Sequence, residues 1–361
     1  MSVALLPRLP SSEVIVGGVG ARTATGSTAL QVAMTVRAGR FRPRESHLVD
    51  RNGQPMVTCR VPAIPDVVYG LERLVALGAP PLALAAQAWM TQAEATRNTA
   101  PIPLICALPP EDRPGFDRRL IRNFLPAMAE ASGVPIDPTR SRLVLHGRGG
   151  GAEAFLLALD RLRAGADAAI LVGGVDSFHD PDALEELDRA LRLHSPECEN
   201  GFVPGEGAGF VLLTHRSRAT GLPRSAQIFG AALEQEPRPF GANKPTHGLG
   251  MTAALRKASA PLGTGARRIG WVMNDVVGER HRIDEWTMAR TRAFQVFQPE
   301  YVHEEPLAVT GDLGAASAAV LLVTACVRFE VGAAPSDCLA IAVHSDGAER
   351  GVVVAGEDRA R

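Results

Sequence analysis

The chain has 361 residues, of which 46% are hydrophobic and 21% are charged, a composition typical of a globular protein with a large buried core. Its net charge of −1 excludes a strong overall attraction to nucleic acid or to an anionic membrane. We find no run of about 18 apolar residues and no apolar N-terminal stretch typical of a signal peptide. We therefore expect a cytoplasmic protein with no membrane or nucleic-acid partner.

Short apolar or β-branched runs alternate with amphipathic segments along the chain. This alternation predicts an α/β fold in which helices cover mixed sheets. The expected strands lie at residues 13–18, 103–107, 142–145, 168–172, 209–213, 226–232, 269–277, 338–344 and 351–355. The expected helices lie at residues 27–38, 71–95, 116–132, 155–162, 184–191, 250–258 and 284–297, and a further one opens at 311–320. We expect Ser27 and Asp284 to cap their helices, and Pro80-Pro81 to break the long one.

The segment at 141–213 is the most informative part of the chain. A predicted strand enters a glycine turn at residues 147–151, and an amphipathic helix follows. A buried strand then ends in Gly173-Gly174, and the chain returns through residues 202–210, which read FVPGEGAGF. Such a turn places backbone N–H groups at a helix N-terminus, where they stabilise negative charge.

Five pieces of the chain, in this order, resemble the β-ketoacyl synthases of the thiolase-fold superfamily. They are residues 13–40, LVGGVDS at 171–177, GFVPGEGAGFVLL at 201–213, TGDLGAASAAVLLV at 310–323 and SDGAERGVVVAG at 345–356. The resemblance implies two pseudo-duplicated βαβ halves, at 1–225 and 226–361, that form a five-layered αβαβα core. It also implies a homodimer, or a heterodimer with a cysteine-bearing ketosynthase, in which the strand at 142–145 pairs across the interface. Acyl carrier protein is a further possible partner.

The resemblance also implies a nucleophilic cysteine at the glycine turn and two catalytic histidines. Here Arg148 stands at or beside the cysteine position, and Asp275 and Asp312 stand at or beside the histidine positions. A guanidinium stays protonated and cannot attack a thioester, so conventional condensation is not expected. Because buried charges need partners, Arg148 could face Asp275, Glu279 and Asp312 in a buried cluster. The alternative is that these side chains point into solvent in a collapsed pocket.

Other polar groups in the sequence are also candidates for the site. His146 in HGRGGG is similar to an esterase oxyanion loop, but no G-x-S-x-G elbow accompanies it, which favours a structural histidine. The polar segment at 274–286 is compatible with a replaced active-site loop, a docking surface or a solvated loop. We take His146, Gly149, Gly150 and Glu279 as substrate-binding candidates. We take Gly173, Gly174, Glu206 and Gly207 as structural.

The five cysteines form no C-x-x-C pair and are expected to be free thiols. They lie away from the turn, at Cys59, Cys106, Cys198, Cys326 and Cys338, and a displaced cysteine nucleophile stays open as an alternative. No motif predicts a metal or another cofactor.

Three functions fit these observations. The first is a non-catalytic partner or acyl-binding subunit, a pseudoenzyme, in fatty-acid or polyketide synthesis. The second is an acyltransferase or condensing enzyme with altered chemistry, in which the oxyanion hole works without a cysteine. The third is a scaffold or adaptor protein for another pathway, such as secretion.

Overall fold

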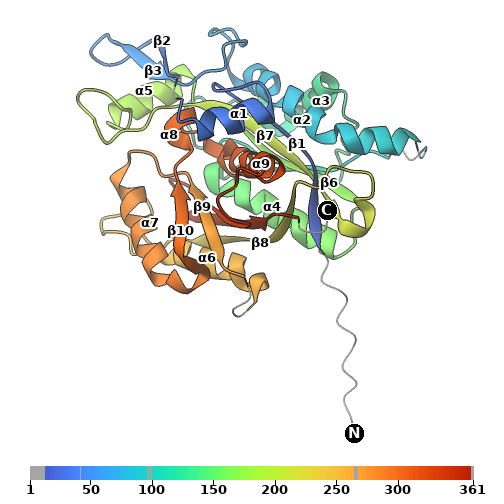
Figure 1. Ribbon diagram of the computed structural model, residues 1–361. Helices are drawn as coiled ribbons and strands as arrows, with labels where there is room; N and C mark the ends of the chain where they lie inside the picture. The colour runs from blue at the N-terminus through green and yellow to red at the C-terminus, as the bar shows by residue number, and fades with distance from the viewer. Residues whose placement is uncertain (1–12, 41, 96, 98–99, 264–266, 359–361) are drawn as a thin grey trace.

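Ten strands form one mixed sheet in the part of the chain that the structure describes (Figure 1). The structure is a computed structural model that describes residues 13–40, 42–95, 97, 100–263 and 267–358. The strand order is β10-β9-β11-β12-β8-β1-β7-β6-β4-β5. The strands are β1 (Val14–Thr23), β4 (Leu104–Ala107), β5 (Arg142–Val144), β6 (Ala169–Ser177), β7 (Glu206–His215), β8 (Ala226–Gln235), β9 (Ile269–Asn274), β10 (Phe297–Glu304), β11 (Cys338–His344) and β12 (Glu349–Gly356). A separate hairpin is formed by β2 (Arg44–Val49) and β3 (Pro55–Thr58).

The helices divide into a central layer and two outer layers. They are α1 (Ala29–Arg37), α2 (Gly70–Ala95), α3 (Arg119–Ser132), α4 (Gly147–Arg163), α5 (Pro181–Arg189), α6 (Leu249–Ser259), α7 (Arg280–Arg292), α8 (Leu307–Thr310) and α9 (Ser317–Glu330). Helices α4 and α9 lie between the two halves of the sheet, with α2 and α3 outside one half and α6 and α7 outside the other (Figure 1). Every residue of α9 from Ser317 to Phe329 is buried, as expected for a helix enclosed on all sides. The predicted α/β fold with layered halves is therefore confirmed.

The two halves of the sheet repeat one plan. In the first half β4 runs parallel to β5 and β6, and β7 pairs antiparallel with β6 and β1. In the second half β9 runs parallel to β10 and β11, and β12 pairs antiparallel with β11 and β8. Helix α4 follows β5 as α9 follows β10, so these two helices are equivalent in the repeat. Strands β1 and β8 join the halves over Val14–Val16, and α4 packs on strands of both halves.

Helix α2 runs unbroken through Pro80 and Pro81, so the predicted break is wrong. A proline cannot donate to the carbonyl four residues earlier, and for Pro80 that carbonyl belongs to Ala76. Arg22 Nη1 donates to Ala76 O at 2.9 Å and satisfies it. The helix is long and apolar enough, by length and composition, to cross a membrane, but it packs against β1, β6, β7 and α3 as a core helix of this fold.

Several predicted element ends are also wrong. Thr28 rather than Ser27 caps α1, and α7 begins at Arg280, so Asp284 lies inside it and does not cap it. Strand β10 occupies residues that were expected to end a helix or to be irregular. Helix α9 begins only at Ser317, because Gly311 and Gly314 have positive φ angles of 75° and 52° that interrupt a right-handed helix.

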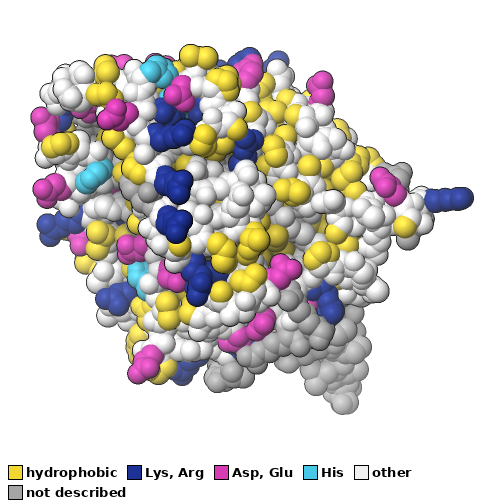
Figure 2. All heavy atoms as spheres, turned by 45° about the horizontal axis from the view of Figure 1, so that its top comes forward, with side chains coloured by type: hydrophobic (Ala, Val, Ile, Leu, Met, Phe, Trp, Pro, Cys, Tyr) yellow, Lys and Arg dark blue, Asp and Glu magenta, His cyan; other side chains and the backbone are white. Residues whose placement is uncertain are grey.

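The surface carries charges of both signs. On the face seen in Figure 2, Lys and Arg side chains lie among Asp, Glu and apolar groups, without a continuous field of one sign. This matches the small net charge of the sequence. The expectation about an N-terminal leader falls on residues 1–12, which lie outside the described residues.

Candidate functional site

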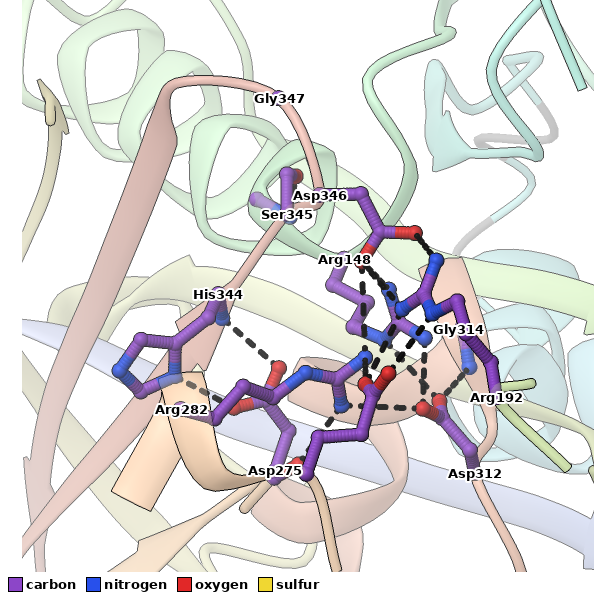
Figure 3. A network of polar contacts seen from close by, with 12 residues as sticks. Arg148, Arg192, Asp275, Arg282, Asp312, Gly314, His344, Ser345, Asp346 and Gly347 are labelled. Carbon is purple, nitrogen blue, oxygen red and sulfur yellow. Dashed lines mark hydrogen bonds and ion pairs between the residues drawn. The ribbon is translucent and has the colours of Figure 1, made fainter. Parts of the chain in front are cut away.

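The N-terminal ends of the two central helices meet in a buried ion pair. Gly147, with a φ of +58°, opens α4, and Arg148 follows in the first turn. Asp312 lies just before the turn that leads into α9. Arg148 Nε and Nη2 donate to the two oxygens of Asp312 at 3.0 and 2.6 Å (Figure 3). Arg148 is 5% exposed and Asp312 is fully buried.

The Asp312 carboxylate is held ionised by its surroundings. It also accepts from the Gly314 N–H at 2.9 Å and from Arg282 Nη1 at 3.0 Å. Burial alone would raise its pKa, but the charges of Arg148 and Arg282 outweigh this and hold the pKa of Asp312 far below its usual range. A cation at a helix N-terminus is unfavourable by itself, so Arg148 depends on this carboxylate.

A second carboxylate, Glu279, adds Arg192 to the cluster and also contacts Arg282. Glu279 precedes α7, and it accepts from Arg192 Nε at 2.7 Å and Nη2 at 3.0 Å. Arg192 comes from the connection between β6 and β7, far away in the sequence. Arg282 Nη2 lies 2.8 Å from Glu279 Oε2, so Arg282 bridges Glu279 and Asp312.

The third carboxylate, Asp346, comes from the turn between β11 and β12. It accepts from Arg148 Nη1 at 3.2 Å and from Arg192 Nη1 and Nη2 at 2.8 and 3.0 Å. Burial would raise the pKa of Asp346, but Arg148 and Arg192 hold it well below its usual range.

Asp275 lies in the same region but takes a different partner. Its carboxylate accepts from the His344 backbone N–H and pairs with His344 Nδ1, both at 2.7 Å. Arg282 reaches Asp275 only at its backbone carbonyl, at 3.1 Å. Burial would raise the pKa of Asp275, but His344 and then Arg282 and Arg148 lower it. The predicted cluster therefore forms around Arg148 with Asp312, whereas Asp275 faces His344, and Glu279 meets Arg192 and Arg282. The alternative of a solvent-facing pocket is wrong for these buried residues.

A cavity of about 600 Å³ opens above this cluster. Its lining includes Arg113, His146, Gly147, Arg148, Arg192 and Asp346. Among the predicted substrate-binding residues, His146 lines it and is exposed, with Nδ1 2.6 Å from Glu153 Oε2. Asp312 and Asp275 lie behind the lining, fully buried.

Gly149 and Gly150 pack inside the protein instead of lining the cavity, so their assignment to substrate contact is not supported by their position. The Gly149 N–H donates to Ser345 Oγ at 2.9 Å, and a Cβ at Gly149 would lie 2.7 Å from Glu349 Cβ. A Cβ at Gly150 would lie 3.1 Å from a methyl of Val144. Glu279 likewise lies buried beneath the arginines.

The residues expected to be structural occupy tight positions. A Cβ at Gly174 would lie 2.3 Å from Ala315 O, and one at Gly173 would lie 2.2 Å from the Phe210 ring. A Cβ at Gly207 would lie 2.9 Å from a backbone oxygen of β1. Glu206 is fully buried and forms a bidentate ion pair with Arg73.

Sequence reasoning missed several members of the site. Arg192, Asp346 and His344 were not singled out, and neither was Arg113, which binds the buried Asp176 at 2.6 and 2.9 Å. Arg282 was noted only as part of the polar segment at 274–286. The one available signal was the segment at 345–356, which contains Asp346 and is one of the five pieces that carry the resemblance.

One group of side chains has the composition of a metal site. Possible ligand atoms of Glu279, His281 and Asp346 lie within 4.8 Å of one another among the described residues. Both carboxylates already bind Arg192, whose charge would oppose a cation there. Burial lowers the pKa of His281 to about 4. The group therefore fits the arginine better than a metal ion.

None of the five cysteines lines the cavity or forms a disulfide. Four are buried, and burial raises the pKa of Cys59 and of Cys338 to about 12 and raises that of Cys106 as well. A buried thiol with a raised pKa is a poor nucleophile. The structure thus offers no support for a displaced cysteine nucleophile.

Comparisons with known proteins agree with this architecture. Residues 149–219 match the family model of the β-ketoacyl synthase N-terminal domain. A stretch of 113 residues is 35% identical to the polyketide synthase ThaQ of Burkholderia thailandensis and covers 28% of this chain but only 5% of that protein.

Solved ketosynthase structures share the fold along the whole chain. A ketosynthase in complex with its type II polyketide acyl-carrier protein superimposes with a TM-score of 0.78 at 15% identity, over 96% of this chain and 100% of that one. A chain of the complex between a ketosynthase and its chain length factor from Xenorhabdus doucetiae superimposes with a TM-score of 0.72 at 15% identity, over 99% of this chain and 100% of that one. The ishigamide ketosynthase/chain length factor gives 0.68 at 17% identity, over 96% and 99%. At these identities the matches show a mixed α/β fold like that of ketosynthases.

Proposed function

We propose that this chain is a ketosynthase-like protein of fatty-acid or polyketide type that does not catalyse condensation and acts as the non-catalytic partner of a cysteine-bearing ketosynthase. The observation that carries this proposal is the Arg148–Asp312 pair at the N-terminal ends of α4 and α9. By the resemblance, that is where a nucleophile and a histidine would stand.

The pair leaves no group there that can form an acyl intermediate. Covalent acyl transfer needs a nucleophile with an available electron pair, such as a thiolate formed beside a base, and a protonated guanidinium has none. Asp312 and Asp346 raise the pKa of Arg148 against the effect of burial, so the guanidinium stays protonated. The carboxylate of Asp312 is engaged by two arginines and a backbone N–H, which leaves it a weak base.

The partner role is supported by the edge of the sheet. Strand β5 forms one end of the strand order and pairs only with β4 among the described residues. An open strand edge is a template for pairing with a second chain. The residues that follow β5, Leu145 and His146, line the cavity, so a partner at this edge would lie beside it. The complexes between a ketosynthase and its chain length factor are a precedent for such pairing in proteins of this fold.

The test is co-expression of the chain with a cysteine-bearing ketosynthase from the same host, followed by size-exclusion chromatography and native mass spectrometry. We expect a heterodimer, and co-purification of only self-associated chain would contradict the proposal. Arg142→Asp, at an exposed position of β5, is expected to abolish the heterodimer. Val302→Asp is the matched control, because Val302 is an exposed residue on β10 at the opposite edge of the same sheet.

A second function, acyl transfer with altered chemistry, is favoured by the cavity that reaches Arg148. Its volume lies within the usual range for small-molecule sites. Incubation with acyl- and malonyl-thioesters distinguishes the two functions. The proposed partner role predicts neither thioester loss nor a covalent adduct. Turnover that His146→Ala or Arg148→Ala removes from a folded protein would establish the enzyme instead.

A further inference from the structure

Three guanidinium groups converge on one partly exposed carboxylate. Asp346 lies 3.2 Å from Arg148, 2.8 Å from Arg192 and 3.6 Å from Arg282, measured between the nearest charged atoms (Figure 3). The side chains of these arginines are 5%, 10% and 1% exposed, whereas that of Asp346 is 43% exposed. Asp346 thus has the most exposed side chain of these four residues, and it lines the cavity.

Asp346 completes the set of carboxylates that bind the three arginines through their side chains. The other two are Asp312 and Glu279, both buried. The carboxylate of Asp275 is taken by His344. Without Asp346, the three arginines would share the two buried carboxylates. A buried cation that loses a partner is destabilised, so this position favours an anion.

The arginines still have N–H groups that could bind an anion. Arg282 Nε and Nη2 are buried and lack a hydrogen-bond partner of good geometry, although Nη2 lies near two carboxylates. The ring of Phe202 lies 5.5 to 6.0 Å from the guanidinium carbons of all three arginines and excludes water from that side. Guanidinium groups bind carboxylates through paired N–H donors, and a dry setting strengthens those bonds.

Asp346 stands at the open side of the cluster, on a turn whose backbone is held by Arg350, so its displacement needs only a rotation of its own side chain. It lies in the short turn between β11 and β12, next to the exposed Gly347, and both residues line the cavity. Asp312 and Glu279, in contrast, are enclosed by the central helices and α7. An anion that entered through the cavity would reach the arginines at the place that Asp346 fills.

We propose that Arg148, Arg192 and Arg282 form a carboxylate-binding site that the chain's own Asp346 fills in this structure, and that a small carboxylate ligand entering the cavity displaces Asp346. The site is independent of the proposed partner role, because it would bind a carboxylate whether or not the chain forms a heterodimer.

The experiment is rescue of an Asp346→Ala variant by small anions, followed by thermal unfolding. We expect the variant to melt roughly 3 °C or more below the wild-type protein. Formate or acetate should restore most of this loss in a saturable way, whereas acetamide and an equal ionic strength of chloride should not. The wild-type protein should respond much less, because its own carboxylate competes for the site.

Two controls keep the result specific. Asp284→Ala removes an exposed aspartate whose partner Arg280 is also exposed, so it should neither lower the melting temperature nor create a response to formate. Arg192→Ala/Asp346→Ala removes one arginine together with the carboxylate that it binds, and should show no formate rescue. If Asp346→Ala does not fold, Asp346→Ser provides the same test, because its shorter side chain also leaves the position of the carboxylate vacant.

The proposal is overturned if Asp346→Ala responds to formate no more than the double variant does. It is also overturned if chloride rescues the variant as well as formate, because the site would then not be selective for a carboxylate. Direct titration of labelled formate by NMR should show tighter binding to Asp346→Ala than to the wild-type protein, and equal binding would count against displacement.

Discussion

Two buried arginine–carboxylate pairs in this molecule have nearly the same geometry and different surroundings. Arg73 and Glu206 form a bidentate pair at 2.5 and 2.9 Å, and Arg148 and Asp312 form one at 2.6 and 3.0 Å. In the first pair, Arg73 Nη1 donates to two backbone carbonyls, and the carboxylate also accepts from a backbone N–H and from a serine hydroxyl. Both side chains of that pair therefore have nearby hydrogen-bond partners, and the pair links α2 to β7.

The second pair remains connected to further charges and to a cavity. Asp312 shares Arg282, and Arg148 shares Asp346, which faces solvent. The comparison teaches that burial of an ion pair does not by itself indicate a functional site. What distinguishes Arg148 is its place at the lining of the cavity and its link to a carboxylate that can be exchanged.

The largest effect should come from removing one arginine of either pair. Arg73→Met and Arg148→Met each leave a buried carboxylate with fewer partners, and we expect each to lower the free energy of unfolding by about 3–5 kcal/mol. Urea unfolding followed by circular dichroism measures this. Among the described residues, Asp312 keeps Arg282 whereas Glu206 has no second arginine bonded to it, so Arg73→Met should be the more severe change.

A larger loss of unfolding free energy in Arg148→Met than in Arg73→Met would contradict the view that Glu206 depends on a single arginine. Arg148→Met/Asp312→Leu is the control for the second pair. Replacement of both partners by apolar groups should recover much of the stability that Arg148→Met loses.

Acidification should weaken the second pair and its connected charges. The folded-state pKa values of Asp312 and Asp346 lie below the unfolded value of about 4. Their contribution to stability is therefore complete above that value and is lost as the pH falls through the lower folded-state values. Unfolding free energies measured between about pH 6 and pH 3 should fall toward the acid end.

The part of this acid dependence that belongs to Asp346 can be isolated. Asp346→Asn should show a shallower fall, because the variant has one titrating carboxylate fewer in the folded cluster. An unchanged slope in the variant would mean that Asp346 is not held by the arginines in solution.

The smallest effect should come from an exposed ion pair. Arg189 contacts Glu185 and Glu186 on α5 with all three side chains largely exposed. We expect Arg189→Ala to change the free energy of unfolding by about 0.5 kcal/mol or less. A larger loss of unfolding free energy would contradict the expectation that exposed ion pairs contribute much less to stability than buried ones.

Local patterns predicted much of the fold. Strands β6, β11 and β12 were located from their continuous apolar runs, and in β6 Gly174 lets Ala315 pack closely. The predictions failed where distant contacts override a local rule. Arg22 satisfies the carbonyl that Pro80 leaves free in α2, and β10, with a largely exposed and polar sequence, is held as a strand by pairing with β9.

The amino-acid sequence by itself determined that the chain repeats a strand–helix plan and that its glycine turn carries Arg148. These facts are local, because glycine turns and residue identities are read from neighbouring positions. Only the tertiary structure decided which charges meet. Arg192 and Asp346 are 154 positions apart, and His344 rather than Arg148 takes Asp275. Partners in a buried cluster are selected by how strands and helices pack and by the cost of leaving any charge unpaired, and neither is written in a sequence motif.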